Sequence, residues 1–182
     1  MFKTHSNRIS TIIGIIIFIV IIYLLAKHPH VVTDIILKSG PLAPIVAIGI
    51  YPLLALTPIP ADPVTVIIAT IYGPITGIFI ALTGMTMAVM VEYLIGAKIS
   101  DGLKFEKDKE KIPFGLGKLP IESIPVLLFG RMIPGYGSKI VSILAGMHKV
   151  PMRRYLWTSI VMNLSGALFL VLGGLGLIEL IK

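Results

Sequence analysis

The sequence predicts an all-α integral membrane protein, in which transmembrane helices accompany two opposed re-entrant half-helix loops in a pseudo inverted repeat. Three observations predict this fold class. Hydrophobic residues make up 55% of the chain and charged residues 14%, with a mean hydropathy of +0.95, far above that of soluble domains. Apolar runs long enough to cross a bilayer recur along one domain. Two further apolar runs are broken near their centres by proline and glycine.

Residues 10–26 predict the first transmembrane helix, because they carry no charge and are long enough to cross a hydrocarbon core of about 30 Å. The preceding Lys3 and Arg8 also fit a signal peptide, but no A-x-A cleavage pattern follows, which favours a retained helix. Residues 31–39 are short and amphipathic, and they predict a helix at the membrane interface.

Residues 41–72 predict the first re-entrant loop. Six prolines interrupt this apolar stretch, and a proline removes a backbone hydrogen bond from a helix, so one straight helix is excluded. We expect two half-helices, near residues 42–56 and 63–72, each too short for a full crossing. The prolines of the expected turn are Pro58, Pro60 and Pro63. Asp62 before Pro63 is typical of a helix cap, and it serves either as a cap alone or also in function.

Residues 73–97 predict a second transmembrane helix. Small residues recur along it at a spacing that suits close packing, within the chain or between two copies; they are Gly73, Gly77, Ala81 and Gly84. Glu92 lies near the end of this span and is either an interfacial residue or a proton carrier. Residues 98–120 hold six lysines and four acids, and they predict a solvated cytoplasmic loop.

Residues 121–147 predict the second re-entrant loop, because proline and glycine again break an apolar run. The residues of the expected turn are Pro134, Gly135, Gly137 and Ser138. Arg131 precedes the break and Lys139 follows it. A serine is a favoured helix cap, so Ser138 is expected to cap the second half-helix. Arg131 either lines a wet cavity or extends to the interface.

Residues 154–180 predict the last transmembrane helix, with Tyr155 and Trp157 as anchors at the interface. Asn163, inside this span, is expected to hydrogen-bond to a neighbouring helix. On this layout, basic residues gather on the side of the N-terminus and of residues 98–120. That distribution predicts a multi-pass protein of the cell membrane with a cytoplasmic N-terminus.

Two sequence blocks resemble one known family. "PIPADPVTVIIATIYGPITG" has a proline-rich turn with an acid, an apolar half-helix and a glycine pair; "FGRMIPGYGSKIVSILAGM" and the following residues have an arginine, a Pro-Gly turn, Ala-Gly-Met and a later asparagine before Gly-Ala. Together they resemble the DedA and VTT-domain membrane proteins, the superfamily that includes the SNARE-associated Golgi proteins.

The resemblance implies an all-helical fold with two facing re-entrant loops and an activity in moving lipids between leaflets, dependent on the proton motive force. By motif position, Asp62 matches the acid of the first block and Arg131 the first arginine of the second. Gly146 and Asn163 lie in the second block, and Lys139 is the nearest basic substitute for a further arginine of the family. A Gly-Asp pair common in the middle span is absent here, although Glu92 is close by.

The residues also support an anion site on their own. Two half-helices that point their N-termini at the midplane present free amides and a favourable dipole to an anion. Arg131 adds a planar fork suited to phosphate, and Lys139 a second cation. We therefore predict a flippase- or scramblase-like transporter for an anionic phospholipid or a polyprenyl phosphate. In its resting state Asp62 pairs with Arg131, and proton uptake by Asp62 accompanies release of the arginine to the headgroup.

Two other functions remain open at this point: a small-ion or proton channel or antiporter, and a membrane assembly factor that transports nothing. Covalent catalysis is not expected, because no nucleophile–base pair, P-loop or zinc motif is present in the sequence. We likewise expect no cofactor, no metal and no nucleic-acid partner. A homo-oligomer is a further expectation, with the face from Gly73 to Gly84 as its contact.

Overall fold

A computed structural model describes residues 30–57, 59–103, 120–133 and 136–181 of the chain. Every regular secondary-structure element in these ranges is a helix, which confirms the predicted all-α class. The expected transmembrane helix at residues 10–26 and most of the expected loop at 98–120 lie outside the described residues. So do three of the expected turn residues, Pro58, Pro134 and Gly135.

The chain forms two compact units, residues 1–43 and 44–182. The described part of the first unit holds α2 (His30–Lys38) and the short 3-10 helix η1 (Gly40–Leu42). Ile36 is the buried residue of α2. The hydroxyl of Ser39 donates to the carbonyl of Ile35 at 2.6 Å and helps to end α2.

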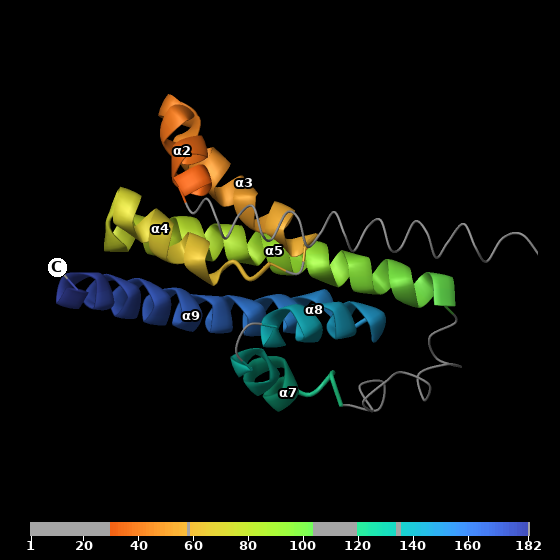
Figure 1. The fold of residues 1–182 in the computed structure, drawn as a ribbon. Helices are drawn as coiled ribbons and strands as arrows, with labels where there is room; N and C mark the ends of the chain where they lie inside the picture. The colour runs from red at the N-terminus through yellow and green to blue at the C-terminus, as the bar shows by residue number, and fades with distance from the viewer. Residues whose placement is uncertain (1–29, 58, 104–119, 134–135, 182) are drawn as a thin grey trace, which may run out of the picture. The chain divides into compact units, whose positions relative to one another are not determined.

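The second unit carries the rest of the fold, coloured from orange to blue in Figure 1. Its helices are α3 (Ala43–Ala55, which begins at the boundary), α4 (Asp62–Tyr72), α5 (Pro74–Leu103), α7 (Ile124–Phe129), η4 (Gly130–Met132), α8 (Gly137–Met147) and α9 (Met152–Ile181). Pro52 lies inside α3 and does not break it, whereas Pro41 lies in η1, where α2 and the following helix are bent by 116°. Gly73, at a positive φ of 79°, ends α4, and Pro74 opens α5.

Two of these helices are long and apolar enough to cross a membrane, over Pro74–Asp101 and Met152–Gly174. A third span results if α2 and residues Gly40–Ala55 are counted together. The 11-residue helices α4 and α8 are apolar but too short to cross alone. The described ranges therefore contain two apolar helices of membrane-spanning length and two apolar helices of about half that length, to which we refer as half-length helices.

The half-length helices lie along the long ones. Helix α4 packs on α5 and α9, and α8 packs on α5. In Figure 1, α4 and α8 begin near the middle of α5 and run away from each other in opposite directions. This arrangement brings the two chain breaks toward one another, in the middle of the long helices.

Helices α5 and α8 are in direct backbone contact. A Cβ atom added at Gly96 of α5 would lie 2.0 Å from the carbonyl oxygen of Ile143, and one added at Gly146 of α8 would lie 2.0 Å from that of Tyr93. Glycine is required at both positions, because neither backbone can yield as a flexible side chain does. The buried core beside this crossing comprises Val89, Tyr93, Ile121, Leu127, Val141, Leu144, Ala145, Val150 and Tyr155.

The small-residue face predicted as a contact between copies is used within the chain. A Cβ at Gly77 would lie 2.8 Å from Cα of Ala69 in α4, and one at Gly84 would lie 2.2 Å from the ring of Tyr51 in α3. Ala81 is fully buried. Helices α3 and α4 therefore cover these positions within the chain, and contact of this face with a second copy stays a prediction.

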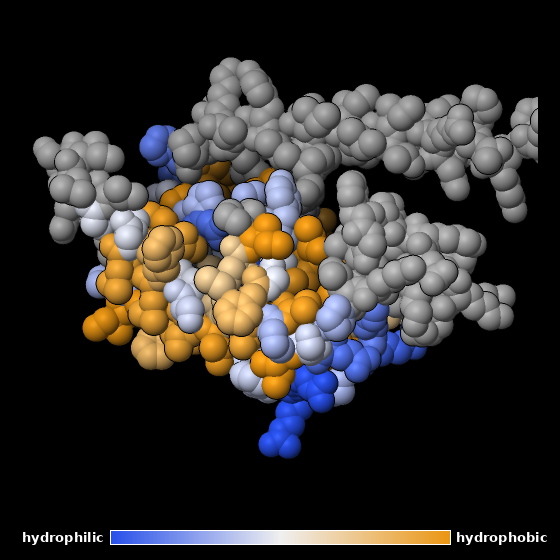
Figure 2. Space-filling view, turned by 90° about the horizontal axis from the view of Figure 1, so that it is seen from below, coloured by the Kyte–Doolittle hydropathy of each residue, from blue (hydrophilic) through white to orange (hydrophobic). Residues whose placement is uncertain are grey.

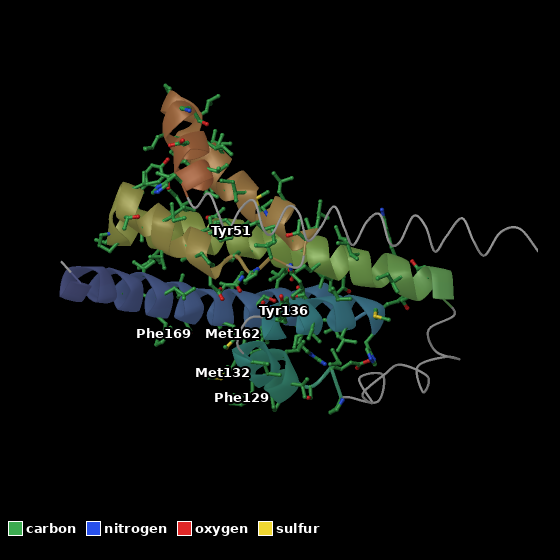
Figure 3. All side chains as sticks on the ribbon, in the orientation of Figure 1. Tyr51, Phe129, Met132, Tyr136, Met162 and Phe169 are labelled. Carbon is green, nitrogen blue, oxygen red and sulfur yellow. The ribbon has the colours of Figure 1, made fainter. Side chains whose placement is uncertain are left out.

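The outer face of α7 and α9 is strongly apolar. Phe129, Met132 and Phe169 expose 66%, 64% and 78% of their surface, and Figure 3 shows all three on the side of α7 and α9 that faces away from α5. Apolar residues cover much of this face in Figure 2, with hydrophilic residues gathered at its edge. So large an apolar patch is unfavourable in water and suits contact with lipid chains.

Candidate functional site

The first break separates α3 from α4 and is organised by a threonine. The hydroxyl of Thr57 donates to the carbonyl of Leu54 at 3.0 Å and accepts the backbone N–H of Ile59 at 3.2 Å. These bonds replace part of the helical pattern that the following prolines prevent. The end of α3 is tightened further by backbone bonds, in which the N–H groups of Leu56 and Thr57 donate to the carbonyls of Leu53 and Leu54 at 3.2 and 3.0 Å.

Asp62 does not cap α4, contrary to the prediction. Ala61 occupies the N-cap position, with no side-chain cap bond, and its carbonyl already accepts the N–H groups of Val64 and Thr65 at 3.0 and 3.2 Å. The backbone of Ala61 is itself near helical, so the helix starts one residue early. Asp62 therefore lies in the first turn with an exposed side chain, where the helix dipole still favours a carboxylate.

The second break follows η4, and α8 begins at Gly137 with Tyr136 as its N-cap residue. Ser138 is therefore in the first turn and not the cap, which corrects the prediction. The N–H of Gly137 bonds to the carbonyl of Ile133 at 3.0 Å. A Cβ at Gly137 would lie 2.6 Å from the carbonyl oxygen of Gly130, so this tight approach requires glycine.

Arg131 is buried in η4 and ties three elements together. Its Nε donates to the carbonyl of Leu127 at 3.1 Å, its Nη1 to the hydroxyl of Ser138 at 3.1 Å, and its Nη2 to the hydroxyl of Ser159 at 2.8 Å. The guanidinium carbon also lies 5.2 Å from the centre of the Tyr155 ring, a cation–π distance. Only 7% of Arg131 is exposed, so it does not extend outward to an interface.

The predicted ion pair between Asp62 and Arg131 is absent. Within the described residues Asp62 forms neither an ion pair nor a hydrogen bond, and the nitrogens of Arg131 bind the carbonyl and hydroxyl groups of its own half of the chain. The pairing fails because Asp62 points outward from the first turn of α4, while Arg131 is held inward by α9.

The buried ion pair joins Lys139 and Glu92 instead. The Nζ of Lys139, in the first turns of α8, lies 4.0 Å from Oε1 of Glu92 in α5. It also donates to the carbonyl of Leu54 at 3.2 Å and to that of Thr57. Lys139 therefore connects the second break to the first. Glu92 exposes only 5% of its surface, so its carboxylate is enclosed by protein.

Tyr155, predicted as an interfacial anchor, is fully buried beside this site. Its hydroxyl donates to the carbonyl of Val89 at 2.6 Å, and its ring lies 4.8 Å from that of Tyr93. The hydroxyl of Tyr93 in turn donates to the carbonyl of Val150 at 2.8 Å. The prediction missed this role because an aromatic residue near a span end was taken for a headgroup contact.

Asn163 and Gly146 occupy buried positions on α9 and α8. The amide nitrogen of Asn163 has no hydrogen-bond partner in the described part of the chain, so the expected interhelical bond from that nitrogen is not formed. Gly146 is part of the backbone crossing with α5. Tyr155, Ser159 and Asn163 are spaced four residues apart, so they form a polar stripe on the otherwise apolar helix α9. This stripe is visible in the sequence and predicts that one face of the helix is buried.

The structure thus gathers Arg131, Ser138, Lys139 and Glu92 with the carbonyl groups of the first break; we call this set the break cluster. Two cations and one carboxylate give it a net positive charge. The contributions of Ser159, Tyr155 and the two carbonyl groups were not predicted from the sequence. Asp62 was expected here, but within the described residues it forms no hydrogen bond or ion pair with the break cluster.

The sequence pattern of the VTT domain matches residues 59–175. The chain belongs to the VTT-domain family. The matched range includes both half-length helices, all of α5, α9 as far as residue 175, and every side chain of the break cluster. Comparison of this VTT-domain protein with curated proteins and with solved structures finds no match. The family is that of the DedA and SNARE-associated Golgi proteins, as the two sequence blocks predicted.

Proposed function

We propose that this VTT-domain protein moves a lipid with an anionic headgroup, either a phospholipid or a polyprenyl phosphate, between the two leaflets of the cell membrane. The observation that carries the proposal is the break cluster, in which a buried cation, Arg131, and a half-buried cation, Lys139, share one buried carboxylate, Glu92. Uncompensated charge inside a membrane protein is costly and is retained mainly where it serves a substrate or ion path. An anionic headgroup supplies the missing negative charge.

The hydrogen-bond inventory of Arg131 supports a phosphate ligand. A guanidinium has five N–H donors, and each of its three nitrogens makes one bond to the protein. Each terminal nitrogen also carries a second N–H, and the Tyr155 hydroxyl is a further partner of the guanidinium. Two such donors on a planar fork match two oxygens of a phosphate, and the free amides at the start of α8 add further donors.

Glu92 is the group that we propose to carry a proton during transport. Glu92 faces Lys139 in the resting arrangement. An anionic headgroup that binds Lys139 competes with Glu92 for this cation. A buried carboxylate without a cation favours its neutral form, so lipid entry is linked to proton uptake. Asp62, exposed at the start of α4, remains a second candidate on the same path and has no ion-pair partner within the described ranges.

Leaflet exchange in reconstituted vesicles tests the proposal. Fluorescent phosphatidylglycerol, phosphatidylcholine and polyprenyl phosphate report exchange of anionic and zwitterionic headgroups separately. We expect Lys139→Ala and Glu92→Gln to slow exchange of an anionic lipid at least about tenfold, which corresponds to about 1.4 kcal/mol of lost stabilisation. Lys98→Gln is the matched control, because Lys98 is an exposed lysine on α5, six residues beyond Glu92, and is not part of the break cluster.

Near-normal exchange in both cluster variants contradicts the proposal. Ion current without lipid movement in the same vesicles indicates a small-ion pathway instead. Absence of both activities in a folded wild-type protein favours an assembly factor. An exchange rate that depends on an imposed proton gradient in wild type, but not in Glu92→Gln, supports the assignment of the proton carrier.

A further inference from the structure

The ammonium group of Lys139 lies among oxygen atoms that come from the other half of the unit. Its Nζ is 3.2 Å from the carbonyl oxygen of Leu54, donates to that of Thr57, and is 4.0 Å from Oε1 of Glu92. We call these three groups the oxygen cage. None of them belongs to α8, the helix that carries Lys139. The cage is therefore assembled by α3, the first break and α5.

The chemistry of the oxygen cage is that of a site for a small monovalent cation. Leu54 is near the C-terminal end of α3, which carries the negative end of the helix dipole, and its carbonyl accepts the N–H and the hydroxyl of Thr57 as well as the Lys139 ammonium. Carbonyl groups of interrupted membrane helices, together with a carboxylate, are the ligands that transporters and channels use for alkali-metal ions. The single negative charge of Glu92 balances one positive charge.

We propose that the oxygen cage is a monovalent-cation site and that the Lys139 ammonium is its resident, covalently tethered cation. The two carbonyl oxygens and the carboxylate solvate the ammonium as they would solvate a sodium ion. Since the ammonium cannot diffuse away, the wild-type protein needs no alkali-metal ion to complete the first break. Removal of the ammonium leaves a cage that sodium, with water as its remaining ligand, can fill.

A purely structural reading of Lys139 makes a different prediction. If the lysine only supplies N–H donors to two carbonyl groups, a metal ion does not substitute for it, because the geometry and the donors are then what matters. If its charge and size matter, a free cation restores the lost stability. The two readings therefore differ in how a variant that lacks Lys139 responds to sodium, whatever lipid the protein moves.

Thermal unfolding of the full chain in detergent separates these readings. Lys139→Ala and wild type are compared in sodium chloride and in N-methyl-D-glucamine chloride at equal ionic strength, since the organic cation is too large for the cage. We expect sodium to raise the Tm of Lys139→Ala by roughly 3–6 °C and to leave wild type unchanged. The double variant Lys139→Ala with Glu92→Gln is expected to lose the sodium effect, because the cage is then neutral.

The absence of cysteine from the chain gives a chemical control. Lys139→Cys introduces a unique thiol, and its alkylation with bromoethylamine restores an ammonium at nearly the length of lysine. We expect the unmodified Cys variant to respond to sodium and the aminoethylated protein to respond no more than wild type.

Three results overturn the proposal: equal unfolding of Lys139→Ala in the two salts, a sodium-specific stabilisation of wild type, and failure of both Lys139→Ala and Lys139→Cys to fold even in high sodium. The third result counts because a filled cage would support folding. All of these readouts are stabilities, so a failure of lipid transport does not imitate them.

Discussion

The two halves of the second unit repeat an order of elements but satisfy their breaks in opposite ways. In the first half α3 is followed by an 11-residue helix and a 30-residue helix; in the second, α7 and η4 are followed by helices of the same two lengths. The first break presents carbonyl oxygens, whereas the second presents the donors of Arg131 and Lys139. The halves are therefore complementary, one rich in acceptors and the other in donors.

The difference shows two ways in which the backbone groups at a helix break are stabilised. A break frees backbone groups that lipid cannot satisfy, so protein groups or trapped water must do so. Arg131 satisfies groups of its own half, while Lys139 reaches across to the carbonyl groups of Leu54 and Thr57. Both cations come from the second half, and the first half depends on one of them.

Loss of Arg131 is expected to have the largest effect on stability. Arg131→Ala removes three hydrogen bonds and a cation–π contact from a buried position, and it leaves a cavity between η4 and α9. We expect the free energy of unfolding to fall by about 3–5 kcal/mol. Denaturant unfolding in mixed micelles measures this, with the exposed Arg153→Ala as control. A loss as small as that of the control shows that the second break does not depend on its cation.

The next largest effect is expected at the backbone crossing of α5 and α8. Gly96→Ala places a methyl group against the carbonyl of Ile143 and is expected to cost about 2–3 kcal/mol. Gly77→Ala, which meets Ala69 of α4 less closely, should cost less. Gly49→Ala is the control, since nothing lies within 4 Å of its added Cβ. Equal stability of all three variants contradicts the claim that the α8 crossing is the tighter one.

A smaller effect is expected from the buried tyrosine hydroxyls. Tyr155→Phe removes the bond to the carbonyl of Val89 in the second half, and Tyr51→Phe removes the 3.0 Å bond with Thr65 in the first. Each change is expected to lower the free energy of unfolding by about 0.5–1.5 kcal/mol, because the ring stays in place. Unfolding of the two single variants and the double variant checks whether the losses add, as they should for separate sites.

The smallest effect on stability is expected at Asp62. Asp62→Asn changes an exposed side chain in the first turn of α4, so only the interaction with the helix dipole weakens, by about 0.5 kcal/mol or less. Thermal unfolding together with leaflet exchange sharpens the contrast with Arg131. Normal stability with lost exchange assigns Asp62 to the transport path, whereas a large loss of stability contradicts its description as exposed and unpaired within the described ranges.

Local signals in the sequence predicted the helices well and the contacts between them poorly. Half-helices expected near residues 42–56 and 63–72 correspond to Ala43–Ala55 and Asp62–Tyr72, because proline and glycine act on their own neighbourhood. The bond from Lys139 to Leu54 joins residues 85 positions apart and ends on a backbone carbonyl, for which no residue type is diagnostic. Arg131 was assigned to Asp62 by symmetry, but serine hydroxyl groups of its own half satisfy it.

The order of synthesis adds a consequence of the Glu92–Lys139 pair. The ribosome completes α5, with Glu92 inside it, before residues 104–119 and α7 are made, and Lys139 follows only after them. A nascent chain therefore has a carboxylate in a membrane helix before its ammonium exists. Until the second half arrives, α5 carries the cost of this carboxylate alone, at most about 3 kcal/mol on insertion scales, and the later pairing with Lys139 offsets it.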